Sequence, residues 1–461
     1  MALKPRSRFT ATILMAAALF LLVVYLVVVE IPQQEKTERA EQTAEQLFNF
    51  KSSDIETIEL RYPASEIELR KSQDGKWQMT KPLKTEADQR EVQSLISTVG
   101  DVRFTRVVEE QAAHLSEFGL DHPHVDITLT LPDHAERLLL GDDGPMPGTL
   151  YARKDGDPRV VLVQQWIKGS LTRTVFDFRT KMVLPIEHEK VDQVQLEFPK
   201  KIIRLDKQDG RWLFGNPVEG LADEAALTSL TLMLQNLNAT TFIDPGPDRD
   251  KTIEGFKKPI VTVTTRESDN GAQKSKTARF YDDPGKDSIY VTTDPDKPIY
   301  RVAKTHMDEL KPELFHYQDK HLVSVQRDAV KGIDIHTPTE QYTLSSKDNG
   351  WMLEGETQPV NPDRVKRLLE QIEKLKAFQA TEKPVKNPAA VGLKPAMIEI
   401  RLTDQTRKAL ATLQLGSELK GMLYARGNTP LGIVLVNKDF LDEIPKKSEL
   451  LKKEAPAVIP R

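Results

Sequence analysis

The sequence predicts an α+β protein built from three tandem repeats of one module, each an antiparallel sheet with packed helices, preceded by one transmembrane helix. Three observations predict this organisation: a long apolar run near the amino terminus, landmarks that recur at a fixed long spacing, and a change of hydrophobic period within each repeat. Self-similarity at a long period is typical of tandem modules. A change of period from two to about 3.6 residues marks strands followed by a helix.

The amino-terminal region holds a run of 20 residues, Thr10 to Val29, without a charged side chain. At about 1.5 Å per residue, a helix of this length spans about 30 Å, the hydrocarbon thickness of a bilayer. Basic residues precede the run in residues 1–9 and Glu30 follows it, so the amino terminus is expected in the cytoplasm. We therefore predict a single-pass protein of the inner (cytoplasmic) membrane with a periplasmic or other extracytoplasmic body.

A cleaved signal peptide is the alternative interpretation of this run. The apolar core of a signal peptide is usually about 7–15 residues and ends at a small-x-small site. This run is longer, and its only alanine cluster, residues 16–18, lies in the middle of it. An uncleaved membrane anchor at residues 10–29 is therefore favoured.

Residues 30–50 are predicted to form a juxtamembrane helical stalk. The stretch from Glu35 to Gln46 is polar nearly all round and rich in helix-forming residues. A dimerising coiled coil would need apolar residues at the a and d positions, and that pattern is missing.

Three tryptophans that follow polar-glycine turns define the repeat: Trp77, Trp212 and Trp351, separated by 135 and 139 residues. A glycine before a large apolar residue recurs 41 to 43 residues after each tryptophan, and a tyrosine recurs 73 to 78 residues after it. The glycines and tyrosines are Gly119, Gly255, Gly392, Tyr151, Tyr290 and Tyr424. We assign modules to residues 51–186, 187–321 and 322–446, followed by a flexible tail at 447–461.

Each predicted module begins with strands and continues with a helix. In the first module, apolar and polar residues alternate over residues 55–69, as in half-buried strands. A helix is then predicted over about residues 86–99, where apolar residues recur at helical spacing. An Asn-Pro signal at 361–362 starts the same helix in the third module. Short loops favour antiparallel pairing of the strands.

The three tryptophans are interpreted as core anchors of the modules. Each follows a hairpin turn and opens a strand, and burying such a ring contributes about 2–3 kcal/mol of transfer free energy. A sugar-stacking platform is the alternative, because exposed aromatic rings bind the faces of ligands.

The composition excludes several classes of site. The chain has no cysteine, which excludes disulfides, thiolate zinc sites and a cysteine nucleophile. Its formal net charge of −4 gives no bulk attraction to nucleic acid. Phosphate-binding glycine loops, a nucleophile elbow and a His-Glu-x-x-His helix are missing from the sequence. We therefore expect no enzyme activity, no cofactor and no nucleic-acid partner.

Two polar clusters are weak candidates for metal binding. His122 and His124 lie two residues apart and could face one ion, but the other modules carry no histidine there, which favours a solvated turn. The acidic residues of the stretch 244–254 loosely resemble a calcium loop. Prolines stiffen that stretch and the glycine of the sixth position is missing, so we interpret it as a variable acidic loop.

Four short motifs resemble those of the domain of unknown function 4340 family. They are a Gly-Leu-Asp-x-Pro turn at 119–123, a Leu-x-Leu-Gly strand end at 138–141, a Tyr-Ala-Arg strand at 151–153 and an Asp-Phe-Arg stretch at 177–179. The first and third modules match best, whereas the second departs at Gly255-Phe256, at 280–282 and at 290–292. The resemblance implies an envelope protein encoded beside ABC-type exporters of the kind linked to gliding motility, and it carries over no functional residue.

The sequence favours a non-enzymatic function, because repeated modules without a repeated reactive residue are typical of binding or scaffolding. We expect a membrane-anchored extracytoplasmic scaffold or accessory protein, associated with an ABC-type transporter or another envelope complex. The alternative is an extracytoplasmic glycan-binding protein that uses aromatic residues such as Trp166, Tyr151 and Phe176. A hydrolase with carboxylates paired across space is the least favoured class.

Overall fold

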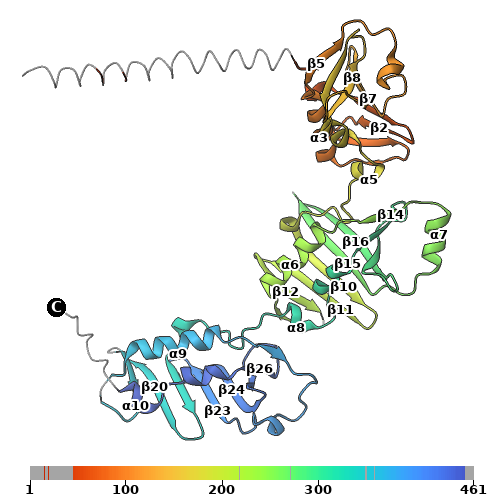
Figure 1. Ribbon diagram of the computed structural model, residues 1–461. Coiled ribbons are helices and arrows are strands. Elements are labelled where there is room, and N and C mark those ends of the chain that lie inside the picture. The colour runs from red at the N-terminus through yellow and green to blue at the C-terminus, as the bar shows by residue number, and fades with distance from the viewer. Residues whose placement is uncertain are drawn as a thin grey trace, which may run out of the picture. The chain divides into compact units, whose positions relative to one another are not determined.

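The computed structural model describes residues 45–216, 219–269, 271–347, 350–357 and 359–451, together with Met15 and Leu19. Three antiparallel sheets follow one another along this part of the chain (Figure 1). The chain divides into two compact units, Met1–Lys181 with the first sheet and Met182–Arg461 with the other two. The predicted α+β class with three repeated sheets is thus confirmed.

Apart from Met15 and Leu19, the predicted membrane span at 10–29 lies outside the described residues, as do the basic segment 1–9, most of the stalk and most of the tail. Among the helices of the described residues, none is both long and apolar enough to cross a bilayer.

The first sheet has nine strands in the order β4-β3-β2-β1-β6-β7-β8-β9-β5. Its strands are β1 (Thr57–Tyr62), β2 (Ser65–Lys71), β3 (Trp77–Lys81), β4 (Thr85–Glu86), β5 (Phe104–Glu109), β6 (Val125–Thr130), β7 (Ala135–Asp143), β8 (Thr149–Lys154) and β9 (Val160–Gln164). Its helices are α3 (Gln89–Gly100), α4 (Trp166–Leu171) and α5 (Val175–Phe178), with 3-10 turns η2 (Ser52–Asp54) and η3 (Leu115–Phe118).

The second sheet repeats this order as β13-β12-β11-β10-β15-β16-β17-β18-β14. Its strands are β10 (Val191–Phe198), β11 (Lys201–Gln208), β12 (Arg211–Asn216), β13 (Gly220–Leu221), β14 (Thr241–Ile243), β15 (Val261–Asp269), β16 (Ala272–Asp282), β17 (Ser288–Thr292) and β18 (Ile299–Ala303). Its helices are α6 (Glu224–Gln235), α7 (Pro247–Glu254) and α8 (Leu314–Tyr317), with turns η4 (His188–Lys190) and η5 (Lys304–Glu309).

The third sheet has eight strands in the order β21-β20-β19-β23-β24-β25-β26-β22. Its strands are β19 (Gly332–His336), β20 (Gln341–Lys347), β21 (Gly350–Leu353), β22 (Gln379–Ala380), β23 (Ile398–Thr403), β24 (Ala409–Leu419), β25 (Met422–Arg426) and β26 (Val434–Asn437). Its helices are α9 (Pro362–Lys374) and α10 (Lys447–Leu450), with turns η6 (Arg327–Ala329), η7 (Pro388–Val391) and η8 (Lys438–Glu443).

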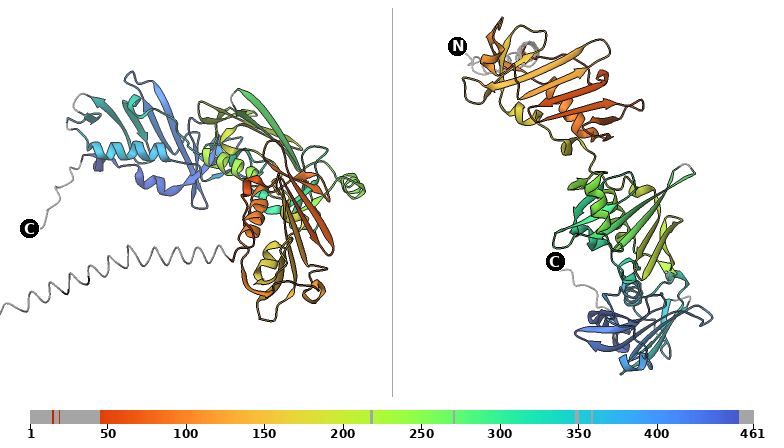
Figure 2. Two further views of the ribbon diagram at one scale, coloured as in Figure 1. Left: turned by 90° about the horizontal axis from the view of Figure 1, so that it is seen from above. Right: turned by 90° about the vertical axis from the view of Figure 1, so that its right-hand side faces the viewer.

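One long helix lies across one face of each sheet, as Figure 2 shows for α9 from two sides. The side chains of Asp88, Asp223 and Asn361 cap the first turns of α3, α6 and α9 by accepting backbone hydrogen bonds. The buried stripes of the helices are the predicted ones, for example Val92, Leu95, Ile96 and Val99 on α3. The helix therefore forms because its apolar stripe closes the core of its sheet.

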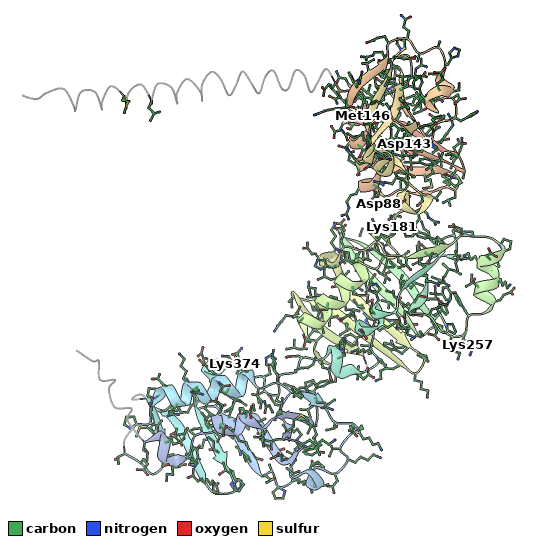
Figure 3. The ribbon with its side chains drawn as sticks, in the orientation of Figure 1. Asp88, Asp143, Met146, Lys181, Lys257 and Lys374 are labelled. Atoms are coloured by element: carbon green, nitrogen blue, oxygen red, sulfur yellow. The ribbon has the colours of Figure 1, made fainter. Side chains whose placement is uncertain are left out.

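The end of each module returns to the start of its long helix. The backbone N–H groups of Asp88 and Asp223 donate to the carbonyls of Phe178 and Tyr317, each at 2.8 Å. The ammonium of Lys181 lies 3.9 Å from the Asp88 carboxylate (Figure 3), and that of Lys320 lies 3.2 Å from the Asp223 carboxylate. The cap residue of the helix thus also fastens the end of the module.

Each sheet and its helix enclose a separate main core. The core of the first sheet takes in Leu47 and Phe48, which the sequence assigned to the stalk. The core of the second takes in Val183 and Ile186, which the sequence assigned to the end of the first module, and the core of the third takes in Leu450. The segments on either side of the predicted boundaries therefore pack into modules rather than standing as linkers.

The core of the second module contains one buried hydroxyl without a hydrogen-bond partner among the described residues, that of Thr265. Thr265 pairs with Val194, and the matching positions opposite Ile58 and Ile333 are Leu129 and Leu402. Burying an unpaired hydroxyl costs about 1–3 kcal/mol. We therefore expect Thr265→Val to raise the free energy of unfolding of this module by about 1 kcal/mol, measured by denaturant unfolding.

A matched control is Thr231, which is also buried but donates its hydroxyl to the Leu227 carbonyl at 2.9 Å. Thr231→Val removes a hydrogen bond that is made, so no such gain is expected. Equal effects of the two substitutions would show that the Thr265 hydroxyl is not unpaired.

Candidate functional site

The two faces of each sheet differ, because successive residues of a strand point to opposite faces. In the first module, Leu138, Leu140 and Ala152 point into the main core beneath α3. Their neighbours Leu139 and Tyr151 point to the other face, which no long helix of the described residues covers. We call this second surface the helix-free face of the module.

A second, smaller apolar cluster lies on the helix-free face of the first module. It joins Phe118 and Leu120 of the glycine-containing turn to Leu139 and Val160 of the sheet, with Tyr151 packed against them. The rings of Phe118 and Tyr151 lie 4.9 Å apart in an edge-on arrangement. Two landmarks of the repeat, the glycine turn and the tyrosine, therefore meet in one structural feature.

Glycines allow the turn and the strand to approach closely. Gly119 and Gly392 have left-handed backbone angles, with φ of 65° and 69°. A Cβ atom on Gly141 would lie 2.1 Å from the carbonyl oxygen of Phe118, and one on Gly416 would lie 2.1 Å from that of Val391. The Leu-Gly strand ends of the first and third modules are thus required by a backbone contact.

The second module builds the same feature from aromatic rings. Gly255 has φ −77° and ends helix α7, and Tyr281 stands where the other modules have Gly141 and Gly416. The Tyr281 ring stacks on Phe256 at 4.2 Å, and Phe256 also lies 5.5 Å from Tyr290. The residues at which this module departs from the family pattern, Phe256, Tyr281 and Tyr290, therefore pack against one another.

The acidic stretch at 244–254 is mostly helical. Residues from Pro247 to Glu254 form α7, with Asp248 and Asp250 in its first turn, so the interpretation as a variable acidic loop was wrong for these residues. Proline at the first helical position and acidic residues in the first turn both favour a helix start.

The repeated tryptophans contribute to the main cores. Trp77 is 5% exposed and Trp212 is 4% exposed, whereas Trp351 is half-buried against the third core. The backbone N–H of Trp77 donates to the Gln89 side chain at 2.8 Å, and that of Trp212 donates to Glu224 at 2.9 Å. The tryptophan strand is thus fastened to the start of the long helix in two modules.

The weak metal candidates lie at the start of β6. His122 is exposed, and the imidazole Nε2 of His124 lies 3.1 Å from a carboxylate oxygen of Asp142. Within the described ranges, no three or more His, Asp or Glu side chains gather in a way that could hold a metal ion. The arrangement thus offers an imidazole–carboxylate pair at the surface.

The aromatic residues considered for glycan binding do not form one platform. Tyr151 lies in the cluster on the helix-free face, whereas Trp166 and Phe176 lie on α4 and α5, which contact α3 on the opposite face. The ring of Phe176 lies beneath the Lys181 ammonium at 5.2 Å, and Trp166 is 63% exposed. Trp166 is therefore left as a separate exposed indole.

The Tyr-Ala-Arg motif places an arginine on the helix-free face. Ala152 and Ala425 are fully buried in the main cores, so the flanking Arg153 and Arg426 point to the other side. Arg426 borders a hollow of about 520 Å³ on the third module. We call this hollow the β24 groove; it is lined by Glu399, Arg401, Ala409, Leu410, Ala411, Thr412, Gln414, Arg426, Gly427 and Asn428.

The polar side chains of the β24 groove are linked across three strands. The Arg426 guanidinium donates twice to the Gln414 amide oxygen, at 3.1 and 2.7 Å, and the Gln414 amide nitrogen donates to Glu399 at 2.8 Å. Arg401, which pairs with Thr412 in the sheet, lies 4.0 Å from the Asp334 carboxylate. The Arg426 guanidinium therefore donates to a neutral amide, whereas the Arg401 guanidinium donates to the backbone carbonyl of Arg407 at 3.3 Å and lies at the limit of ion pairing with Asp334.

On the same face of the first module, one arginine is paired with carboxylates and the other binds a backbone carbonyl. Arg137 donates two hydrogen bonds of 2.9 Å to the buried Asp126 carboxylate, which raises the pKa of the Arg137 guanidinium, and lies 3.9 Å from Asp155. Arg153 donates to the backbone carbonyl of Asp157 at 2.9 Å. The Asp157 carboxylate in turn binds Arg159, which lowers the pKa of that carboxyl group. This module thus carries its own carboxylates beside its arginines.

A family model described as "Domain of unknown function (DUF4340)" matches the chain three times, over residues 77–259, 212–395 and 351–457. Each match begins at one of the repeated tryptophans. No curated protein and no solved structure matches the chain.

Proposed function

The chain belongs to the DUF4340 family, and we propose that it is a membrane-anchored, extracytoplasmic scaffold or accessory protein associated with an ABC-type transporter or another envelope complex. The observation that supports this proposal is the use of the repeated residues. The tryptophans pack in the main cores, and the first two modules pack their glycine turns and tyrosines in a second cluster. Residues that recur for packing favour a repeated binding scaffold over a repeated reactive centre.

Anchoring is proposed through residues 10–29, with the amino terminus in the cytoplasm and the modules outside. The chain lacks cysteine, so an introduced cysteine is the only thiol. We expect a membrane-impermeant maleimide to label Lys374→Cys, an exposed position on α9, in spheroplasts, and to label Ser7→Cys only after lysis. Labelling of Ser7→Cys in intact spheroplasts, or release of the protein by alkaline carbonate, would reject the anchor.

The scaffold role is tested by affinity capture of the full chain from detergent-solubilised membranes. We expect an integral-membrane partner to be retained by the anchored chain. A control in which residues 1–29 are replaced by a cleaved export signal should recover much less of it, because tethering in one membrane raises the effective concentration of the partners. Capture that returns no integral-membrane protein would count against the proposal.

Glycan binding is a second candidate, and the one observation that favours it is that Trp166 is 63% exposed. Exposed indoles stack on sugar faces, and the neighbouring Gln164 and Gln165 are exposed as well. This function requires that the protein bind an immobilised glycan and that Trp166→Ala abolish the binding. Silence on a glycan array would dispose of it.

A further inference from the structure

The third module differs from the first in the charged residues that follow the arginine of its Tyr-Ala-Arg motif on the helix-free face. Arg153 is followed two and four residues later by Asp155 and Asp157, whereas Arg426 is followed at the same distances by Asn428 and Pro430. In the part of the chain that the structure describes, no carboxylate lies within ion-pair distance of Arg426. The third module therefore has the arginine without the two acidic residues that follow it in the first module.

The guanidinium of Arg426 is nevertheless held in place. Its two hydrogen bonds to Gln414 fix the plane of the group, and the bond from Gln414 to Glu399 fixes the amide in turn. A carboxylate is a stronger acceptor than an amide oxygen and binds a guanidinium in a two-pronged geometry. A preorganised arginine with a neutral partner is therefore ready to exchange that partner for an external carboxylate.

The shape of the groove fits an extended chain. Thr412 and Gln414 lie on the helix-free face of β24, with Arg401 on the neighbouring β23 and Arg426 on β25, and Leu410, which also packs against the main core, borders the groove at a β-bulge. Five residues of extended chain span about 17 Å, the length of strand over which these side chains recur. Leu410 and Ala409 offer apolar contact at one end, and Gln414 and Thr412 offer hydrogen-bonding groups.

From these observations we propose that the β24 groove binds an extended, acidic polypeptide segment of the partner protein, whose carboxylates pair with Arg401 and Arg426. The inference rests on the proposed scaffold role for the existence of that partner. A polypeptide is favoured over a phosphate or sulfate polymer because the groove combines two guanidinium groups with an apolar end and with one carboxylate of its own, Glu399. A uniformly anionic polymer would place further charges against Glu399.

The test uses the full chain in detergent micelles and a fluorescent decapeptide of alternating Glu and Thr, with a Lys–Thr decapeptide as the matched probe. Fluorescence anisotropy at low ionic strength should show binding of the Glu–Thr peptide but not of the Lys–Thr peptide. The affinity for the Glu–Thr peptide should fall as salt is added. The double variant Arg401→Gln/Arg426→Gln should lower the affinity at least tenfold. Arg153→Gln, the same change at the matching position of the first module, should leave it unchanged.

A second variant keeps both arginines and tests whether weaker peptide binding comes from the changed charge of the groove or from a folding defect. Thr412 lies directly opposite Arg401 and two residues from Gln414 on the same face, so Thr412→Glu supplies a carboxylate inside the groove. This variant should weaken the Glu–Thr peptide about as much as the double variant does, while the thermal unfolding of the module stays near that of the unchanged protein.

Three outcomes would overturn the proposal: equal binding of the Glu–Thr peptide by the unchanged chain and the double variant, no binding at all, or binding of dextran sulfate through the two arginines without binding of the peptide. These results are independent of affinity capture. If a membrane partner is captured but the peptide does not bind, the partner binds elsewhere on the modules. If the peptide binds but no partner is captured, the groove is a peptide-binding site and the scaffold role is rejected.

Discussion

Replacing Gly141 with alanine is expected to lower the free energy of unfolding of the first module by about 3 kcal/mol, and Gly416→Ala is expected to do the same in the third. The added Cβ would lie 2.1 Å from the carbonyl oxygen of Phe118 or Val391. That oxygen belongs to the backbone of a turn held by left-handed Gly119 or Gly392, so it cannot rotate away as a side chain would. The turn must move away from the sheet, and in the first module the apolar cluster beneath it opens.

Amide hydrogen exchange measured by mass spectrometry would report this effect module by module. We expect faster exchange in β7 and β8 for Gly141→Ala and in β24 and β25 for Gly416→Ala, with the other modules unchanged. Gly169→Ala serves as the control, because Gly169 lies in α4 with nothing within 4 Å of the added Cβ. That change should be neutral or stabilising by up to about 1 kcal/mol. Unchanged exchange in Gly141→Ala would mean that the turn does not sit against the strand.

The period and order of landmarks in the sequence were enough to predict the three sheets and their long helices. The stripe on α3 and the asparagine cap of α9 are local features, which depend on residues three or four apart. The module boundaries were less well predicted, because they depend on contacts between residues that are far apart in the sequence. Val183 and Ile186 look like any short apolar stretch, and only the tertiary contact with the second core assigns them to that module.

The features that define the helix-free face depend on contacts that one sequence does not display. Gly119 and Gly141 were both visible as motifs, yet that they meet depends on how the turn folds back over the sheet. The groove depends on register, because Glu399, Gln414 and Arg426 come together only when β23, β24 and β25 pair as they do. The signal that could have drawn attention to it is that Asn428 and Pro430 stand in the third copy of the loop where the first has Asp155 and Asp157.

Truncating the repeated tryptophans should separate a core anchor from a ligand platform. We expect Trp77→Ala and Trp212→Ala to cost about 3–5 kcal/mol each, because both rings are buried and lie beneath lysines, Lys71 at 5.9 Å and Lys207 at 6.0 Å. Trp351→Ala should cost less, since that ring is half-buried and pairs with Ser346 in place of a lysine. Amide exchange in β3, β12 and β21 reports the local unfolding free energy of each module in the three variants. If the tryptophans formed a ligand platform, none of the three substitutions would change that exchange.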